Sequence, residues 1–231
     1  NMNIAIYDLD KTITSRPTFT HFLIFYAQQA SPIRLAGLPL WILALIGYRI
    51  GLYGRKPLKQ FGIQLFIGRK IGSDALTRVV RKFADNVASR GLQPGAVAQL
   101  RVDRDRGAFL VLATAAPEFY AQTIGDFLGF QAVIATRHIM TAHGQITNRI
   151  LGDNCYADEK LRRIEGWLAQ CSIDRKAAHI VFYSDDISDS PTLNFADQAY
   201  AVNPSKNFAA AAAKANWGVM DFRNAGDVAQ V

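Results

Sequence analysis

The stretch Asn3-Ile-Ala-Ile-Tyr-Asp-Leu-Asp-Lys-Thr12 decides the fold that the sequence predicts. Residues 4–7 form a short apolar run without glycine or proline, which is typical of a strand buried on both faces. The run ends in two carboxylates, Asp8 and Asp10, separated by one residue. Two such charges about 4 Å apart repel by roughly 4 kcal/mol at an effective dielectric constant of about 20, so the pair favours a bound cation, and a hard ion such as Mg²⁺ suits oxygen ligands best. Two solvated acids at the end of a strand are the ordinary alternative.

The length and composition are those of a folded chain with one full core and a smaller second unit. The chain has 231 residues, of which 50% are hydrophobic and 19% are charged, which excludes a disordered protein. Two cysteines, Cys155 and Cys171, suit a reducing compartment and argue against a disulfide scaffold. No Cys/His group has the spacing of a zinc site. Because acids at positions 8 and 10 argue against a signal peptide, we expect a cytoplasmic protein.

The net charge of +7 is concentrated in one segment. Between Thr12 and Ser73 there is no acidic residue, whereas the rest of the chain carries 18 basic and 19 acidic residues. The segment holds eight basic residues: Arg16, Arg34, Arg49, Arg55, Lys56, Lys59, Arg69 and Lys70. An imbalance this local indicates an anionic partner of the segment. The cations alternate with aliphatic residues instead of gathering on a polar face, so we do not expect that partner to be nucleic acid.

The same segment is predicted to be helical. A helix over 18–29 is followed by Ser31-Pro32, which ends it and starts a second helix. Residues 35–48 carry no charge, but as a helix they would extend about 21 Å, short of the roughly 30 Å of a bilayer core. Three aromatic residues edge this helix: Trp41, Tyr48 and Tyr53. With the cations that follow, they suit a membrane surface, and the core of an ordinary helical domain is the alternative.

Strands and helices alternate through the rest of the chain. A helix over 74–90, capped by Ser73, leads to a helix over 95–106. The later segments are predicted as strands over 109–113, 131–135, 180–183 and 198–202, a hairpin over 138–150, and helices from Pro117, over 158–170 and over 208–215. This alternation predicts an α/β fold with a doubly wound parallel sheet, which binds ligands at the carboxyl ends of its strands.

Reactive side chains gather at those predicted strand ends. They are Asp8, Asp10, Thr114, Asp185 and Asp189, while Lys160 lies in the first turn of the helix over 158–170. A cation in a first turn opposes the helix dipole, which sets Lys160 apart, although a solvated lysine is the alternative. Asp189 is expected to orient a metal-bound water or a metal ligand, and Thr12 to support the metal ligands in the same way.

This set of residue types permits phosphoryl transfer. Asp8 can attack phosphorus and form an aspartyl-phosphate. Asp10 can give a proton to the displaced oxygen and later take one from the water that hydrolyses the intermediate. A Mg²⁺ ion held by Asp8, the main chain of Asp10, and Asp185 would neutralise Asp8 and the phosphoryl oxygens together. Thr114 and Lys160 can bind phosphoryl oxygens, and Lys160 supplies positive charge to the transition state.

Four motifs, taken together and in this order, resemble those of the haloacid dehalogenase superfamily. They are Asp8-Leu-Asp-Lys-Thr12, Leu112-Ala-Thr-Ala-Ala-Pro117, Lys160 and Tyr183-Ser-Asp-Asp-Ile-Ser-Asp189. Their order and spacing are similar to the phosphoserine-phosphatase-like branch, subfamily IB. The resemblance implies a Rossmann-like core over 1–13 and 91–231 with a helical cap inserted over 14–90. It also implies a Mg²⁺-dependent enzyme that hydrolyses phosphate monoesters.

Three positions depart from the family pattern. Ser184 stands where glycine is usual, Asp186 where a small residue is usual, and Ala116 where serine often follows the second motif. Asp186 is either an additional metal ligand or a solvated neighbour. None of the three removes a group that the chemistry requires, so we expect activity.

The composition of the predicted cap bears on the substrate. A phosphoserine pocket needs a carboxylate for the ammonium group, and this cap has none before Asp74. A basic, apolar cap suits a lipid or other anionic phosphate at the inner face of a membrane, and it is similar in character to the cap of phosphatidylglycerophosphatase C, a bacterial member of the same branch. The alternatives are a soluble phosphatase of small metabolites such as phosphoserine, a phosphomutase or phosphotransferase, and a membrane-surface binding module with a silent site.

Overall fold

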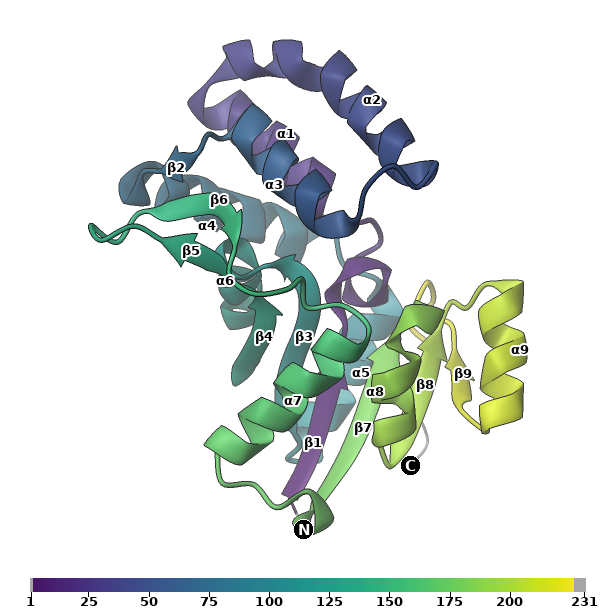
Figure 1. Cartoon of the computed structure of the whole chain (residues 1–231). Helices are drawn as coiled ribbons and strands as arrows, with labels where there is room; N and C mark the ends of the chain where they lie inside the picture. The colour runs from purple at the N-terminus through teal and green to yellow at the C-terminus, as the bar shows by residue number, and fades with distance from the viewer. Residues whose placement is uncertain (1, 227–231) are drawn as a thin grey trace.

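Six parallel strands form the central sheet of the protein. The computed structural model describes residues 2–226, so residues 1 and 227–231 of the predicted core lie outside the described residues. The strand order is β4-β3-β1-β7-β8-β9 (Figure 1). The strands are β1 (Met2–Tyr7), β3 (Phe109–Pro117), β4 (Ala132–Thr136), β7 (Ala178–Ser184), β8 (Gln198–Val202) and β9 (Gly218–Met220). Every neighbouring pair is parallel, so the predicted doubly wound α/β sheet is confirmed.

Helices cover both faces of this sheet, and β1 shows why. Ala5 and Tyr7 belong to the core on one face, whereas Ile4 and Ile6 belong to the core on the other, because successive side chains of a strand point to opposite sides. The first core is completed by α4 (Ser73–Arg90), α5 (Pro94–Asp105) and α6 (Glu118–Leu128). The second is completed by α7 (Asp158–Gln170), α8 (Ser190–Phe195) and α9 (Lys206–Ala215). The four side chains of residues 4–7 in β1 are buried, as the apolar run predicts.

A helical layer stands beyond the carboxyl ends of the strands (Figure 1). It consists of α1 (Phe19–Ala30), a 3₁₀ turn (Pro32–Gly37), α2 (Leu38–Arg49) and α3 (Arg55–Phe66). We call these elements the cap helices. The predicted cap boundaries, 14–90, stay a prediction, and α4, the last helix of that range, packs against α6.

A second, three-stranded sheet joins the cap helices to the chain after β4. The short strand β2 (Lys70–Ile71) pairs antiparallel with β6 (Ile146–Ile150), which forms the predicted hairpin with β5 (His138–Met140). Gln60 of α3 adds two bonds: its carbonyl accepts from Asn148 Nδ2 at 3.1 Å, and its Oε1 accepts from Ile150 N at 3.0 Å. The hairpin is therefore tied to the cap by main-chain pairing and by a helix contact.

Several local predictions are wrong. Ser73 does not cap α4: the helix begins at Ser73 itself, with Gly72 at the capping position and no capping side chain. The second cap helix begins later than predicted, because Pro32 starts a 3₁₀ turn and α2 begins only at Leu38, with a proline in its first turn. Strands β2 and β9 were not predicted, since two or three residues are too few to show an alternation.

The aromatic edge predicted for the uncharged helix is wrong for Trp41, whereas Tyr48 and Tyr53 are half-buried. Trp41 is buried inside the cap, where its ring packs against Phe19 and Phe66, and Tyr53 donates its hydroxyl proton to the Ala44 carbonyl. Residues 35–48 are apolar on all sides of the helix, so no periodicity told which face turns inward. Within residues 2–226 no helix is both long and apolar enough to cross a bilayer. Cys155 and Cys171 are both free, as predicted.

A buried polar cluster fixes β1 against α5. The Tyr7 hydroxyl donates to Asp103 Oδ2 at 2.5 Å, and Gln99 Nε2 donates to Asp103 Oδ1 at 3.1 Å. The Tyr7 ring also stacks on Tyr183 of β7, with ring centroids 4.4 Å apart. Because Asp103 is almost fully buried, its carboxylate needs both donors.

We expect Tyr7→Phe to lower the free energy of unfolding by about 2 kcal/mol, since a hydrogen bond to a buried carboxylate is lost while the ring is kept. Urea denaturation followed by circular dichroism measures this change. The matched control is Tyr200→Phe, because Tyr200 also stacks on Tyr183, with centroids 5.2 Å apart, and is only half-buried. Its effect should stay within about 0.5 kcal/mol. Equal effects of the two variants would contradict the role given to Asp103.

Candidate active site

Three adjacent strands, β3, β1 and β7, carry the predicted reactive side chains to one edge of the sheet. Asp8 follows β1 directly, Thr114 lies in β3, and Asp185 follows β7. Because the strands are parallel and neighbouring, their carboxyl ends meet at this edge, below the cap helices (Figure 1). A main-chain hydrogen bond holds the ends of β1 and β7 together, because the Asp8 amide donates to the Tyr183 carbonyl at 3.0 Å.

A tight turn over Leu9–Ile13 brings Thr12 back toward the strand ends. Lys11 takes a left-handed conformation in this turn, with φ of 60°, which is uncommon for a residue other than glycine. The Thr12 hydroxyl accepts from the Asp185 amide at 3.0 Å. It also lies 3.4 Å from Asp8 Oδ2 and 3.5 Å from Asp185 Oδ1. The two carboxylates therefore face the same hydroxyl from the ends of neighbouring strands.

Lys160 reaches the same place from α7, where it is 2% exposed. Its ammonium donates to Asp8 Oδ1 at 2.8 Å and to Asp189 Oδ2 at 2.6 Å. Asp189 Oδ2 also accepts from the Ser184 hydroxyl at 2.7 Å, so the serine that replaces the usual glycine supports Asp189. Burial acts to lower the pKa of Lys160, but the two carboxylates outweigh it and raise this pKa overall.

The electrostatic balance at the carboxylates is uneven. Burial, only partly offset by Lys160, raises the pKa of Asp8 to about 7. Burial and the negative charge of Asp8 raise the pKa of Asp185 to about 8. One lysine therefore does not compensate the acids gathered here.

The donor set at this position fits a hard divalent cation. Asp8 and Asp185 offer carboxylate oxygens on either side of one hydroxyl, and the Asp10 main-chain carbonyl lies in the turn between Asp8 and Thr12. Asp189 Oδ1 is buried and has no hydrogen-bond partner among the described residues. Oxygen donors and uncompensated negative charge suit Mg²⁺. Within residues 2–226 no three His, Cys, Asp or Glu side chains are grouped closely enough to hold a metal ion by themselves.

The Asp10 side chain points away from these oxygens and toward the cap. Its Oδ1 accepts from the Thr18 amide at 2.8 Å and from the Thr18 hydroxyl at 2.7 Å. The Thr18 hydroxyl lies 2.9 Å from the Tyr120 hydroxyl, which donates to it in turn. Two donors thus fix Oδ1, and Asp10 also lines the pocket. This arrangement permits the Asp10 carboxyl group to exchange a proton with a group bound there.

A pocket of about 220 Å³ opens over these groups. Thr114 lines it, and its buried hydroxyl accepts from the Ala116 amide at 3.0 Å. Asp186 lies at its edge, where Oδ1 accepts from the Ser188 amide at 2.8 Å and caps the turn over Ile187–Asp189. Asp186 thus has a structural use in the turn.

The cap closes this pocket with residues that the motifs did not indicate. Arg55, at the start of α3, lies over the Tyr156 ring at 3.8 Å and donates to its hydroxyl at 3.1 Å. Lys59, one turn further, donates to the Ala115 carbonyl at 2.5 Å and to Asn154 Oδ1 at 2.7 Å. Only the excess of basic residues in the cap pointed toward Arg55 and Lys59. No sequence signal marked Asn154 or Tyr156.

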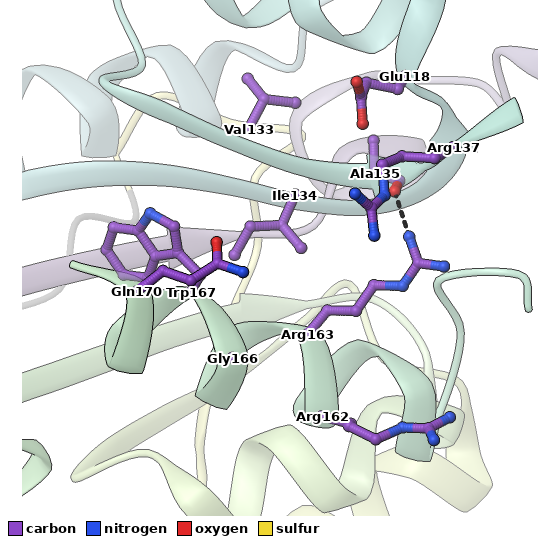
Figure 2. Close-up of a pocket in the computed structure, with 10 residues that line it drawn as sticks. All are labelled: Glu118, Val133, Ile134, Ala135, Arg137, Arg162, Arg163, Gly166, Trp167 and Gln170. Atoms are coloured by element: carbon purple, nitrogen blue, oxygen red, sulfur yellow. Dashed lines mark hydrogen bonds between the residues drawn. The ribbon is translucent and has the colours of Figure 1, made fainter. Parts of the chain in front are cut away.

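A different pocket, of about 340 Å³, lies between β4 and α7 (Figure 2). Arg163 crosses it and is fully engaged: it donates to Glu159 Oε1 at 2.8 Å, to the Ala135 carbonyl at 2.7 Å and to the Asp153 carbonyl at 2.6 Å. None of the predicted site residues lines this pocket. Arg163 joins α7 to the sheet through these bonds, and it is not part of the candidate site.

The sheet order and this site define a hydrolase of a known family. A family model for haloacid dehalogenase-like hydrolases matches residues 5–194, and the chain belongs to this family. Protein CicA of Caulobacter vibrioides is 30% identical over 199 residues, which are 84% of this chain and 83% of CicA.

Two solved structures share the fold. A protein of unknown function from Bordetella pertussis Tohama I matches with a TM-score of 0.85 at 24% identity, over 96% of this chain and 99% of that one. A phosphoserine phosphatase, solved as a phospho-aspartyl intermediate analogue, matches with a TM-score of 0.63 at 13% identity, over 97% of this chain and 94% of that one. The predicted family, fold and enzyme class are confirmed: the chain is a haloacid dehalogenase-type hydrolase with the fold of a phosphoserine phosphatase.

The buried ammonium of Lys59 gives a pH-dependent prediction. Burial, above all, lowers the pKa of Lys59 from 10.5 to about 8. The unfolded chain binds this proton more tightly than the folded protein does. The charged ammonium therefore lowers the free energy of unfolding by its full amount below pH 8, and this destabilisation disappears as pH rises toward 10.5. Relative to Lys59→Met, the wild type should gain up to about 3 kcal/mol of unfolding free energy over this interval.

Urea denaturation at a series of pH values measures the difference between the two proteins. Lys214→Met is the control, because Lys214 is exposed on α9 and its variant should run parallel to the wild type. A Lys59→Met curve that is parallel as well would show that the Lys59 ammonium is not destabilised by burial.

Proposed function

We propose that this hydrolase cleaves phosphate monoesters by transferring the phosphoryl group to Asp8. The observation that carries the proposal is the position of Asp8: its carboxylate is held 2.8 Å from Lys160 and shares the Thr12 hydroxyl with Asp185, at the base of the pocket. A nucleophile fixed beside one cation and oxygen ligands for another is suited to an anionic phosphoryl group.

In the first step an Asp8 oxygen attacks phosphorus, an O–P bond forms, and the bond to the leaving oxygen breaks. Asp10 gives a proton to that oxygen. The two hydrogen bonds from Thr18 hold the Asp10 carboxyl group in place for this transfer. In the second step water attacks phosphorus and Asp10 takes its proton. Inorganic phosphate leaves and Asp8 is restored.

The other residues hold the phosphoryl group and the acids. The Thr114 hydroxyl can donate to a phosphoryl oxygen, and Lys160 neutralises the charge shared by Asp8 and the transferring group. Mg²⁺, held by Asp8, Asp185 and the Asp10 carbonyl, would supply further positive charge at the phosphoryl oxygens. Asp189 orients Lys160 at 2.6 Å, and it can hydrogen-bond a water with its unpaired oxygen. The phosphoserine phosphatase of the same fold was solved as a phospho-aspartyl intermediate analogue, which supports this route.

The substrate is proposed to be a phosphate ester whose leaving group carries a second anionic group. Arg55 from the cap lines the pocket, Lys59 donates to the carbonyl of Ala115 in its wall, and between residues 12 and 73 the chain has no acid to bind an ammonium group. A lipid phosphate at the inner face of a membrane fits this description. A soluble metabolite phosphatase, a phosphotransferase and a binding module with a silent site remain the competing proposals.

We expect wild-type protein with Mg²⁺ to release phosphate from p-nitrophenyl phosphate, and Asp8→Asn to lower kcat by at least about 10³-fold because the nucleophile is removed. Chelation with EDTA should abolish the wild-type activity, and added Mg²⁺ should restore it. Asp126→Asn, a change on the exposed face of α6, should behave as wild type. Activity in Asp8→Asn equal to wild type would rule out the aspartyl-phosphate route, and an inactive wild type would favour the binding module.

We expect Arg55→Gln to raise KM about tenfold for esters with a second anion, such as phosphatidylglycerophosphate, while KM for p-nitrophenyl phosphate changes by less than about twofold. A panel with phosphoserine and sugar phosphates, assayed for released phosphate, ranks the substrate classes. Arg69→Gln is the control, because Arg69 is exposed and outside the pocket. A uniform KM for all esters in wild type and variant would contradict a role of Arg55 in specificity.

A further inference from the structure

Helix α2 exposes an apolar face that none of residues 2–226 covers. Four of its aliphatic side chains are exposed between 50% and 63%: Leu40, Ile42, Leu43 and Ile46. Ile33 before the helix and Ile50 and Leu52 after it are 82%, 68% and 70% exposed. We call these seven residues the α2 face. The helix is the outermost element of the cap (Figure 1), and Trp41 is buried on its inner side against Phe66. A helix that is apolar all round is normally buried, so this face indicates a partner.

A groove beside the α2 face continues the apolar surface toward the active site. It has a volume of about 410 Å³ and lies between α2 and α3, lined by Leu40, Leu43, Leu52, Tyr53, Pro57 and Phe61 among others. Pro57 is two residues from Arg55, which borders the catalytic pocket. The start of α3 therefore separates an apolar groove from a site for an anionic group.

The charges around the α2 face favour an anionic partner. The chain has no acid between Lys11 and Ser73, and Arg49, in the last turn of α2, is exposed. Lys56 at the start of α3 is 41% exposed, but its ammonium lies 3.9 Å from Asp153 Oδ1 and donates to the Gly152 carbonyl, so part of its charge is already paired. An exposed apolar helical face that ends at Arg49, within a segment without acids, suits the boundary between the headgroups and acyl chains of an anionic bilayer.

We propose that the α2 face docks the protein on an anionic lipid surface, with α2 lying in the plane of the interface. Α helix of this length extends about 18 Å, which suits lying in the interface and not crossing it. The docking concerns the cap alone. Only its consequence, that a lipid-borne phosphate monoester is presented to Asp8 across the start of α3, rests on the proposed function.

The test is flotation of the full chain with two kinds of vesicle: phosphatidylcholine alone, and phosphatidylcholine with about one third phosphatidylglycerol. We expect binding to the anionic vesicles that weakens with salt. Leu43→Ser/Ile46→Ser should lower the partition coefficient by about tenfold or more, because both side chains leave water on docking. Arg49→Gln should reduce binding to the anionic vesicles only.

The matched control is Phe127→Ser/Val219→Ser, which removes two apolar side chains that are 43% and 58% exposed on the core and should leave binding unchanged. Thermal melting shows that each variant is folded. Asp8→Asn should bind as wild type, so a failure of the phosphatase proposal and a failure of docking are distinguishable. The proposal is overturned if wild type does not bind anionic vesicles at low salt, or if the serine variants bind as wild type. It is also overturned if light scattering shows a dimer that does not bind vesicles and that Leu43→Ser/Ile46→Ser converts to a monomer.

Discussion

The ion cluster of Lys160 with Asp8 and Asp189 is the interaction on which the site depends. One ammonium, 2% exposed, donates to two carboxylates from different strand ends at 2.8 and 2.6 Å. A buried charge is tolerated only when it is paired and hydrogen-bonded, so each partner constrains where the other two can lie. With Asp185 on the far side of Thr12, the acids still outnumber the cation. The folded chain thus leaves uncompensated negative charge at the point where a cation and a phosphoryl group would bind.

Residues of the cap segment hold two parts of the candidate site in place. Thr18, immediately before α1, fixes Asp10 with two hydrogen bonds, and Tyr120 of the core supports Thr18. From the opposite side, Lys59 of α3 reaches the carbonyl next to Thr114. Asp10 and the loop after Thr114 are therefore both held by residues of the cap segment. Under the proposed function, this would link recognition of the leaving group to the chemistry at Asp8.

The sequence predicted the elements whose pattern is local. The buried run before Asp8, the bounds of α7 and of β8, and the polar strand ends all follow from apolar periodicity and from where it stops. It could not predict Arg55, Lys59, Asn154 and Tyr156 as neighbours, because they meet only through packing of α3 on the loop after β6. Nor could it predict which face of α2 is buried, because the helix is apolar on every side. Trp41 is buried because its ring packs against Phe66 inside the cap.

The pairing of β2 with β6 bears on how a substrate enters. Main-chain bonds join the hairpin to β2, about 75 residues away along the chain, and the contacts of Gln60 join it to α3. An opening motion that lifted α3 alone would break this ladder. A motion that moved the hairpin and the cap helices together would keep these bonds, so the hairpin and α3 act as one unit toward an entering substrate. The contacts of Arg55 with Tyr156 and of Lys59 with Asn154 join the same unit to the wall of the pocket.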